Sequence, residues 1–303
     1  MTPITPHTPI GFIGLGNMGG AMVRHLCKAG YTVRAWARNP AVLSQFADTP
    51  LIAADTLQTL CEHSAVICLN VTRTEDVESL LFRDDGLAQH AKAGTVIVDF
   101  STIDAGRVKA FVPALQAKQI QYLDSPVSGG AAAAKAATLT IMVGGNAEVF
   151  QSLLPLFQVL GKTVRHVGPN GAGQAIKAAN QMAMCIQLVG IAEAMNYALE
   201  QGANPTMALE VMQAGLAGRK VVEWAGPHMV EGFTRAPSIE AHLHAKDVNM
   251  VAEAARAQGL NLPLLYRTAD ILRELVENGP ASQDTSRVFE LVRAHLKGPG
   301  IQR

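Results

Sequence analysis

A glycine-rich turn between an apolar strand and a helix is the feature that most constrains how this chain can fold. Residues 11–19 read Gly-Phe-Ile-Gly-Leu-Gly-Asn-Met-Gly and lead into an alanine-rich stretch, 21–30, that we expect to be helical. Gly14 permits a tight turn, Gly16 lets backbone N–H groups approach an anion, and Gly19 lets the helix pack closely on the strand. The pattern predicts a pyrophosphate-binding turn. The residues assigned to it are Gly14, Leu15, Gly16, Asn17, Met18 and Gly19.

The next predicted strand, 31–37, follows at the spacing of a βαβ unit, so its end should lie beside the ribose of a bound dinucleotide. A site for NAD usually carries Asp or Glu at this point, whereas this chain has Ala-Arg-Asn-Pro over 37–40. The Arg38 guanidinium can pair with a 2′-phosphate, and no carboxylate here would repel one. We therefore predict NADP as the favoured cofactor and NAD as the alternative. The competing interpretation is that Arg38 is a solvated loop cation.

The first half of the chain alternates short apolar segments with segments of helical spacing. Such alternation predicts a largely parallel sheet that is covered by helices on both faces. The expected strands are 10–15, 32–36, 65–70, 95–100, 121–125 and 140–143. We assign Asn70 and Val71, where the third of these strands ends, to the same cofactor site.

After residue 164 the pattern becomes helical. A helix is expected from about 172 to 201, and its apolar residues occupy most faces, which is typical of a helix buried on several sides. Further helices are expected over 206–214, 221–229, 246–258, 264–278 and 286–296. We predict an α/β fold with a doubly wound Rossmann domain over 1–168, including a flexible tail over 1–9. An all-helical domain over 169–303 would follow, connected by the long helix and able to pair with a second subunit.

Composition narrows the classes of partner. Lys+Arg and Asp+Glu number 25 each, so no net charge attracts nucleic acid or an anionic membrane. The four cysteines show no CxxC pair or zinc-site spacing, as expected for small apolar residues of a reduced interior. The first nine residues lack the regions of a signal peptide, and no uninterrupted apolar run reaches membrane length. We expect a cytoplasmic protein.

Lys177 and Asn180 lie three residues apart near the start of the long helix and therefore share a face. A lysine within an apolar turn is costly to bury, and burial lowers its pKa, which suits proton transfer to or from a carbonyl oxygen. Asn180 could orient the ammonium group or bind a substrate hydroxyl. The competing interpretation is that Lys177 extends into solvent from an amphipathic helix.

Two further patterns have the residue types of a binding site. Ser128, Gly129 and Gly130 follow a predicted strand and expose a hydroxyl and unhindered N–H groups that suit a small carboxylate, although such a segment is also an ordinary turn. His242 and His244 have the spacing of a ligand pair, but no carboxylate or thiolate accompanies them at ligand spacing. We predict no metal site.

Five segments, in order along nearly the whole chain, resemble the β-hydroxyacid dehydrogenase family, which includes 3-hydroxyisobutyrate dehydrogenases and tartronate semialdehyde reductases. They are residues 11–19, Val-Asp-Phe-Ser-Thr over 98–102, Asp-Ser-Pro-Val-Ser-Gly-Gly over 124–130, the 171–181 segment, and Lys-Asp over 246–247. The resemblance implies a catalytic role for Lys177 and a substrate-site role for Asn180. It also implies a carboxylate-binding loop, nicotinamide-side contacts and a dimeric or tetrameric enzyme. The residues concerned are Ser128, Gly129 and Gly130 for the loop, and Thr102 and Lys246 for the contacts.

The implied activity is hydride transfer between a nicotinamide cofactor, NADP favoured, and a small semialdehyde or β-hydroxy acid such as tartronate semialdehyde or 3-hydroxyisobutyrate. The 215–218 segment is similar to tartronate semialdehyde reductases, whereas Arg219 and the 232–244 segment depart from the expected pattern. Arg219 is either a second anion contact or a surface cation. The alternatives are an imine reductase, whose members typically carry another residue at the Lys177 position, and a non-catalytic nucleotide sensor.

Overall fold

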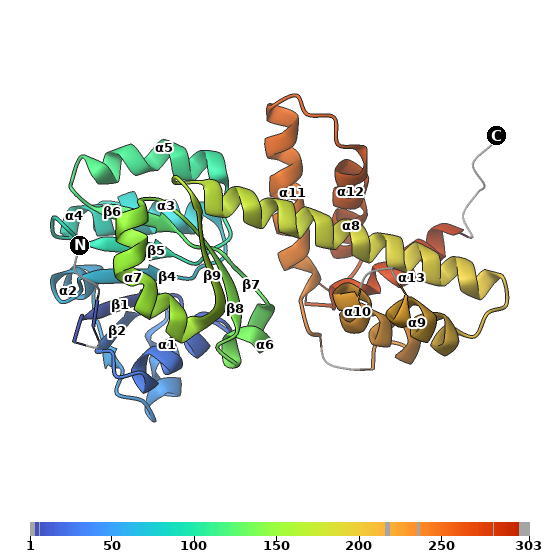
Figure 1. Ribbon diagram of the computed structural model, residues 1–303, viewed down its shortest axis with the longest axis horizontal. Coiled ribbons are helices and arrows are strands. Elements are labelled where there is room, and N and C mark those ends of the chain that lie inside the picture. Colours follow the sequence, from blue (N-terminus) through green and yellow to red (C-terminus); the bar gives the residue numbers. More distant parts are fainter. Residues whose placement is uncertain (1–3, 6, 216–218, 235–236, 281, 297–303) are drawn as a thin grey trace. The chain divides into compact units, whose positions relative to one another are not determined.

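The computed structural model describes residues 4–5, 7–215, 219–234, 237–280 and 282–296. Its contacts divide the chain into two compact units, Met1–Lys177 and Ala178–Arg303. The division falls inside one continuous helix, α8 (Ala172–Glu200), which is coloured yellow-green in Figure 1. Each unit is described by itself.

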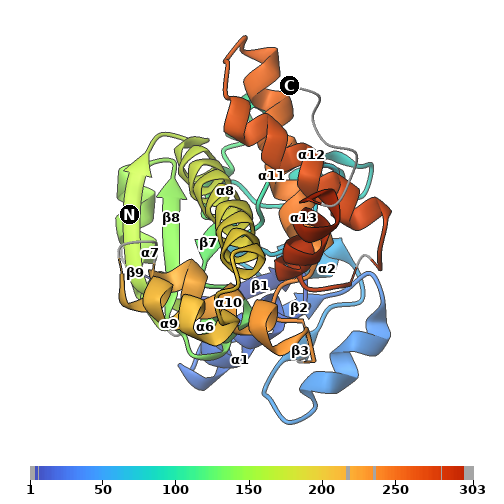
Figure 2. The same cartoon turned by 90° about the vertical axis from the view of Figure 1, so that its right-hand side faces the viewer.

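The first unit is built on a mixed sheet of nine strands among its described residues, with β3-β2-β1-β4-β5-β6-β8-β7 as the strand order and β9 paired with β8. The run from β3 to β6 is parallel, β8 is antiparallel to β6 and β7, and β9 is parallel to β8. Figure 2 shows β1, β2 and β3 at one side of this sheet and β7, β8 and β9 at the other. The strands are β1 (Ile10–Ile13), β2 (Val33–Trp36), β3 (Ile52–Ala53), β4 (Val66–Leu69), β5 (Val96–Asp99), β6 (Gln121–Asp124), β7 (Val127–Ser128), β8 (Leu139–Gly144) and β9 (Gly161–Gly168).

The strands alternate their side chains between two apolar cores, one on each face of the sheet. In β4, Val66 and Cys68 join one core, and Ile67 and Leu69 join the other. This two-residue period with both faces buried explains the continuously apolar strand sequences. It confirms the Rossmann-type fold class that the sequence predicts.

Helices cover both faces of the sheet (Figure 1). Side chains of α1, α6 and α7 join one core, and side chains of α2, α3, α4 and α5 join the other. The described part of the segment predicted as a flexible tail is attached to the first unit: the Ile4 N–H donates to the Ser152 carbonyl at 2.9 Å, and the Pro9 carbonyl accepts from the Ala65 N–H at 3.0 Å. The helices are α1 (Gly19–Lys28), the 3-10 helix η1 (Pro40–Phe46), α2 (Leu57–Glu62), α3 (Thr74–Phe82), α4 (Leu87–His90), α5 (Ala105–Gln116), α6 (Gly130–Lys135) and α7 (Ala147–Leu160).

The second unit is all-helical in its described residues, as predicted. Its core is formed by apolar side chains from the distal part of α8 and from the helices that follow. Among these helices α11 packs with α12 and α9 with α10, pairs that Figure 2 also shows. The elements are α9 (Pro205–Ala214), α10 (Arg219–Glu231), α11 (Ala241–Ala257), α12 (Pro263–Glu277), the 3-10 helix η2 (Thr285–Arg287) and α13 (Val288–Leu296).

All six predicted strands form, within two residues of their expected ends, but three others were missed. β3 has two exposed residues and β7 has two residues in all, while β9 carries Lys162, Arg165 and His166, so none shows an apolar strand pattern. The start predicted at residue 246 for α11 is wrong, because the helix begins at Ala241. Its first turns contain His242 and His244, and His244 is buried against Thr285, a partner that a helical pattern does not reveal.

Within the described residues, α8 alone is long and apolar enough to cross a membrane by length and composition. The buried core helix of a globular protein meets the same criterion. Leu188, Ala192 and Met195 of this helix are fully buried in the core of the second unit. Packing in the core of the second unit therefore accounts for part of the apolar character of α8.

Candidate active site

The turn between β1 and α1 has the shape of an anion cradle. At Gly14, where φ is +98°, a Cβ atom would lie 2.0 Å from the Asn70 carbonyl oxygen, and at Gly19 it would lie 1.9 Å from the Gly14 carbonyl oxygen. At Gly16 nothing lies within 4 Å of that position. Packing therefore demands glycine at two positions, whereas Gly16 faces open space that a ligand can enter. Helix α1 has no side-chain cap and no acidic residue in its first turn, so its N-terminus suits a phosphate.

Arg38 lies just beyond β2 and is exposed. Among the described residues, no acidic side chain forms an ion pair with it. The neighbouring Asn39 caps the helix η1, its side chain accepting from the Ala41 N–H at 3.1 Å. The guanidinium is therefore available to a ligand, at the end of the strand that neighbours β1. Its role in binding a 2′-phosphate stays a prediction.

The loops after β4 and β5 meet at the same edge of the sheet. Asn70 lies against Gly14, and the Val71 N–H donates to the Ser101 hydroxyl at 2.9 Å. Thr102 is the next residue in the second loop. The structure thus brings the predicted cofactor residues at 14, 70, 71 and 102 together, because the carboxyl ends of β1, β4 and β5 are adjacent.

Two buried carboxyl groups stabilise this edge. Asp99 accepts from the Ser101 N–H at 2.9 Å and from the Tyr122 hydroxyl at 2.6 Å. Burial raises the pKa of Asp99 to about 6, although these hydrogen bonds act in the opposite direction. Burial also raises the pKa of Asp124. Sequence reasoning assigned neither residue a role, although each stands in a segment that resembles the family.

Asp124, at the end of β6, caps helix α8 from a distant part of the chain. Its two carboxylate oxygens accept from the Gly171 N–H at 2.8 Å and the Gln174 N–H at 3.1 Å. A Cβ at Gly144 or Gly173 would come within 3 Å of this carboxylate, so both positions need glycine. The carboxylate satisfies two of the N–H groups that every helix leaves free at its start.

Lys177 and Asn180 follow this cap on α8. Lys177 is 7% exposed and is the last residue of the first unit, in contrast to the solvated alternative considered from the sequence. Asn180 is exposed, and its side chain donates to the Gln181 side-chain oxygen at 3.3 Å. Helical spacing keeps both on one face of α8. Their catalytic and substrate-binding roles remain predictions.

The segment predicted to bind a carboxylate contains the short strand β7 and the start of α6. Ser128 pairs with Thr140 of β8, and Gly129 and Gly130 have φ values of +123° and +64°. A Cβ at Gly130 would meet nothing within 4 Å, and α6 has no side-chain cap. A Cβ at Gly129, by contrast, would lie 2.4 Å from the Ala133 Cβ. The role of this segment in binding a carboxylate stays a prediction.

In the second unit, Asp247 connects two helices. It accepts from the Gln181 side chain of α8 at 2.7 Å, and the Lys246 ammonium lies 2.9 Å from its other oxygen. The sequence did not reveal the Gln181 contact. Of the two histidines considered as ligands, His242 lies 3.3 Å from Glu240 and His244 bonds to Thr285 at 3.0 Å. The described residues contain no group of three side chains able to hold a metal.

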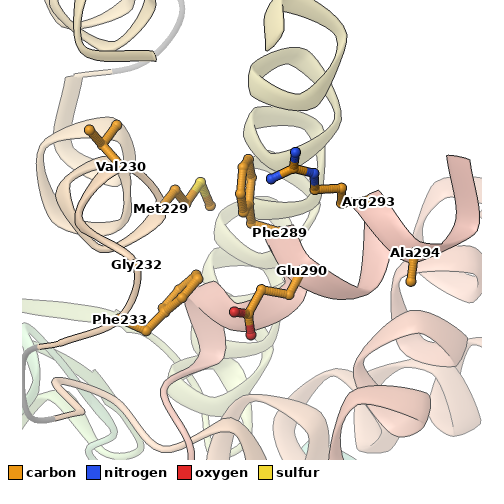
Figure 3. A pocket seen from close by; sticks show the side chains of 8 residues that line it. All are labelled: Met229, Val230, Gly232, Phe233, Phe289, Glu290, Arg293 and Ala294. Carbon is orange, nitrogen blue, oxygen red and sulfur yellow. The ribbon is translucent and has the colours of Figure 1, made fainter. Parts of the chain in front are cut away.

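A separate pocket of about 510 Å³ lies in the second unit between α10 and α13. Figure 3 shows Met229 and Phe233 on one side of it and Phe289 and Arg293 on the other. None of the predicted site residues lines it. Residues 216–218 and 235–236, from the segments considered for substrate choice, lie outside the described residues, and so does the side chain of Arg219.

Comparison with known proteins establishes the family. A profile described as the NAD binding domain of 6-phosphogluconate dehydrogenase matches residues 9–168. A second, described as NAD-binding of NADP-dependent 3-hydroxyisobutyrate dehydrogenase, matches residues 171–292. The chain is 34% identical to a 2-hydroxy-3-oxopropionate reductase of Escherichia coli, over 94% of this chain and 98% of that protein. It is 33% identical to a 3-hydroxyisobutyrate dehydrogenase of Pseudomonas aeruginosa, over 85% and 88%.

Comparison with a solved structure supports the same family. The 3-hydroxyisobutyrate dehydrogenase of Mycobacterium tuberculosis, described with L-serine, superposes with a TM-score of 0.87 at 28% identity, covering 95% of this chain and 99% of that one. The chain belongs to the β-hydroxyacid dehydrogenase family. It is an NAD(P)-dependent oxidoreductase that acts on the CH–OH group of a β-hydroxy acid.

Proposed function

We propose that this enzyme prefers NADP and interconverts a short semialdehyde acid and its hydroxy acid. Tartronate semialdehyde, which is 2-hydroxy-3-oxopropionate, is the first candidate, and 3-hydroxyisobutyrate is the second. The observation that carries the cofactor preference is the exposed Arg38 just beyond β2, in a loop without Asp or Glu from residue 37 to 40. The identity to a 2-hydroxy-3-oxopropionate reductase supports the substrate class.

The residues present fit a dinucleotide. The open space at Gly16 and the uncapped start of α1 suit the pyrophosphate, and Arg38 suits a 2′-phosphate. Asn70, Val71 and Thr102, from adjacent strand ends, would border the nicotinamide half, with Lys246 as a further predicted contact. When bound, the nicotinamide supplies or accepts the hydride.

We assign to Lys177 the transfer of the proton to or from the substrate oxygen. In the reductive direction its ammonium donates a proton to the carbonyl oxygen as the carbon is reduced, and in the oxidative direction its amine accepts the hydroxyl proton. Ser128 and the N–H groups of Gly129 and Gly130 would hold the substrate carboxylate. Asn180, on the Lys177 face of α8, would bind a substrate hydroxyl or orient the ammonium.

Initial rates with NADPH, and separately with NADH, test this function. The substrates would be tartronate semialdehyde, methylmalonate semialdehyde, succinic semialdehyde and glyoxylate, with Lys177→Ala as the matched variant. Lysine-dependent turnover of one acid, faster with NADPH, is the expected result. Turnover of a cyclic imine but of none of these acids would support imine reduction instead. Tight NADPH binding without turnover of either class would support a nucleotide sensor.

We further propose that the enzyme is a cytoplasmic homodimer or homotetramer without nucleic-acid or membrane partners. The four cysteines are buried and free, which fits a reducing compartment, and the formal net charge is zero. Five exposed apolar side chains among the described residues of the second unit support self-association. They are Tyr197, Met207, Val211, Leu260 and Leu264. Light scattering after gel filtration should give two or four times the mass of the chain, and a monomer would contradict this proposal.

A further inference from the structure

The side chain of Gln174 connects helix α8 to the loop after β5 at two points. Its Oε1 atom accepts from the Ile103 N–H at 3.1 Å, and its Nε2 atom donates to the Ser101 carbonyl at 2.8 Å. Because an N–H can only donate and a carbonyl can only accept, these partners determine the orientation of the amide. All three residues are at most 2% exposed. Both hydrogen bonds therefore lie away from bulk water.

The pairing has the pattern of a β-ladder. In a parallel sheet, one residue donates its N–H to the carbonyl of a residue on the neighbouring strand and accepts at its carbonyl from the N–H two residues further along. The Gln174 side-chain amide takes the place of those two backbone groups, so it holds the two residues that flank Thr102. On the other side, Ser101 donates its N–H to Asp99 and accepts at its hydroxyl from Val71. The loop is thus held from two directions.

The backbone of Gln174 is held as well. Its N–H donates to the Asp124 carboxylate at 3.1 Å, in the first turn of α8. Lys177 follows three residues later on the same face of the helix. One residue therefore connects the loop that contains Thr102 with the helical turn that carries Lys177.

We propose that Gln174 is a positioning residue, which sets the distance between Lys177 and the loop Ser101–Ile103 on the nicotinamide side. This inference rests on the proposed function, in which that loop borders the nicotinamide and Lys177 transfers the proton. Hydride and proton must reach the two atoms of one carbonyl, which are about 1.23 Å apart. An error of about 1 Å in such an arrangement costs roughly a hundredfold in rate.

The first test is Gln174→Met, which keeps the length of the side chain and removes both hydrogen bonds. We expect kcat to fall by about ten- to a hundredfold, while the Kd for NADPH changes by less than about threefold. The isotope effect on kcat, measured with NADPH deuterated at the transferred position, should rise because hydride transfer becomes slower than product release. A kcat within twofold of the wild type in the folded variant would overturn the inference.

The second test is Gln174→Glu, which remains informative if the methionine variant does not fold. A protonated carboxyl group can accept from the Ile103 N–H and donate to the Ser101 carbonyl, whereas an ionised one has no donor. We expect kcat to be near the wild-type value at low pH and to fall at least about tenfold as this carboxyl ionises, a step that the wild-type profile lacks. Circular dichroism at each pH would confirm that the protein stays folded. A pH profile parallel to that of the wild type would overturn the inference.

Gln283→Leu is the matched control. Gln283 donates to the Leu275 carbonyl at 2.7 Å in the second unit, so the variant loses a comparable side-chain bond to backbone. We expect its kcat to match the wild type, and an equal loss of kcat would overturn the inference.

Lys177→Ala separates the proposed function from the positioning role of Gln174. Undiminished turnover in Lys177→Ala would contradict the proposed function, whereas a loss there without one in the Gln174 variants would contradict only the positioning role.

Discussion

Asp124 on β6 and Gln174 on α8, fifty positions apart in the chain, are connected by a hydrogen bond of 3.1 Å from the Gln174 N–H to a carboxylate oxygen. The other oxygen of Asp124 accepts from the Gly171 N–H. A strand thus supplies the cap that a helix normally takes from its own flanking sequence. This contact holds the first turn of α8, three residues before Lys177, against the end of β6.

We expect Asp124→Ala to lower the free energy of unfolding by about 2–4 kcal/mol, because two buried N–H groups lose their acceptor. Urea denaturation of the purified protein measures this. Asp104→Ala is the control: Asp104 caps α5 by accepting from the Arg107 N–H at an exposed site, and its loss should cost only about 1 kcal/mol. Equal losses in the two variants would argue against a special role for the Asp124 cap.

Alanine at Gly16 and at Gly19 should have opposite effects. A Cβ at Gly16 meets no atom within 4 Å, so we expect Gly16→Ala to keep its melting temperature and to bind NADPH more weakly. A Cβ at Gly19 would lie 1.9 Å from the Gly14 carbonyl oxygen, so Gly19→Ala should be strongly destabilised. Thermal melts with and without NADPH separate the two effects. Tight NADPH binding by Gly16→Ala would contradict the assigned phosphate site.

Arg38→Ala should weaken NADPH selectively. Loss of a charge-assisted hydrogen bond to the 2′-phosphate predicts a Kd for NADPH that rises by roughly ten- to a hundredfold, with little change for NADH. Fluorescence titration with both cofactors measures this. Arg165→Ala is a suitable control, since Arg165 is an exposed cation on β9, at the other side of the sheet. An equal effect on NADH would show that Arg38 does not read the phosphate.

Lys177→Ala should lower kcat by about two or more orders of magnitude, the range expected for loss of a general acid, with little change in the Kd for NADPH. The measurement is steady-state kinetics on the acid that the substrate panel identifies, together with a cofactor titration. Because Lys177 is buried, a melting curve must accompany the kinetics, so that loss of activity is scored only for folded enzyme. Retained turnover would rule Lys177 out as the proton donor.

Asp99 predicts a dependence of stability on pH. Burial raises its pKa in the folded protein to about 6 from an ordinary value of 3.8. Between these values the folded state binds more protons than the unfolded state, so the contribution of Asp99 to stability falls as pH rises from about 4 to about 6 and is constant above. Asp99→Asn does not titrate. Its stability relative to the wild type should therefore improve by on the order of 2 kcal/mol between pH 4.5 and 7.5. A constant difference across that range would show that the Asp99 pKa is not raised.

Much of the fold was determined by local sequence. Repeats of two residues in strands and of 3.6 residues in helices can be recognised within a short segment. The glycine turn from Gly14 to Gly19, the apolar strands and the shared helix face of Lys177 and Asn180 could therefore be predicted. From these follow the six predicted strands, the sheet covered by helices on both faces and the helical second unit. The segments that resemble the family indicate which residues form the candidate active site.

Tertiary structure alone decided which side chains hold that site together. Asp124 meets Gly171 across 47 positions, Gln174 meets Ile103 across 71, and Gln181 meets Asp247 across 66. The strand β9 and the early start of α11 likewise depend on partners far along the chain. A buried polar group needs a complementary partner wherever the fold places one, and that choice leaves no periodic trace in the sequence. The sequence by itself therefore determined the elements and the residues suited to chemistry, and the folded chain decided how those residues are held.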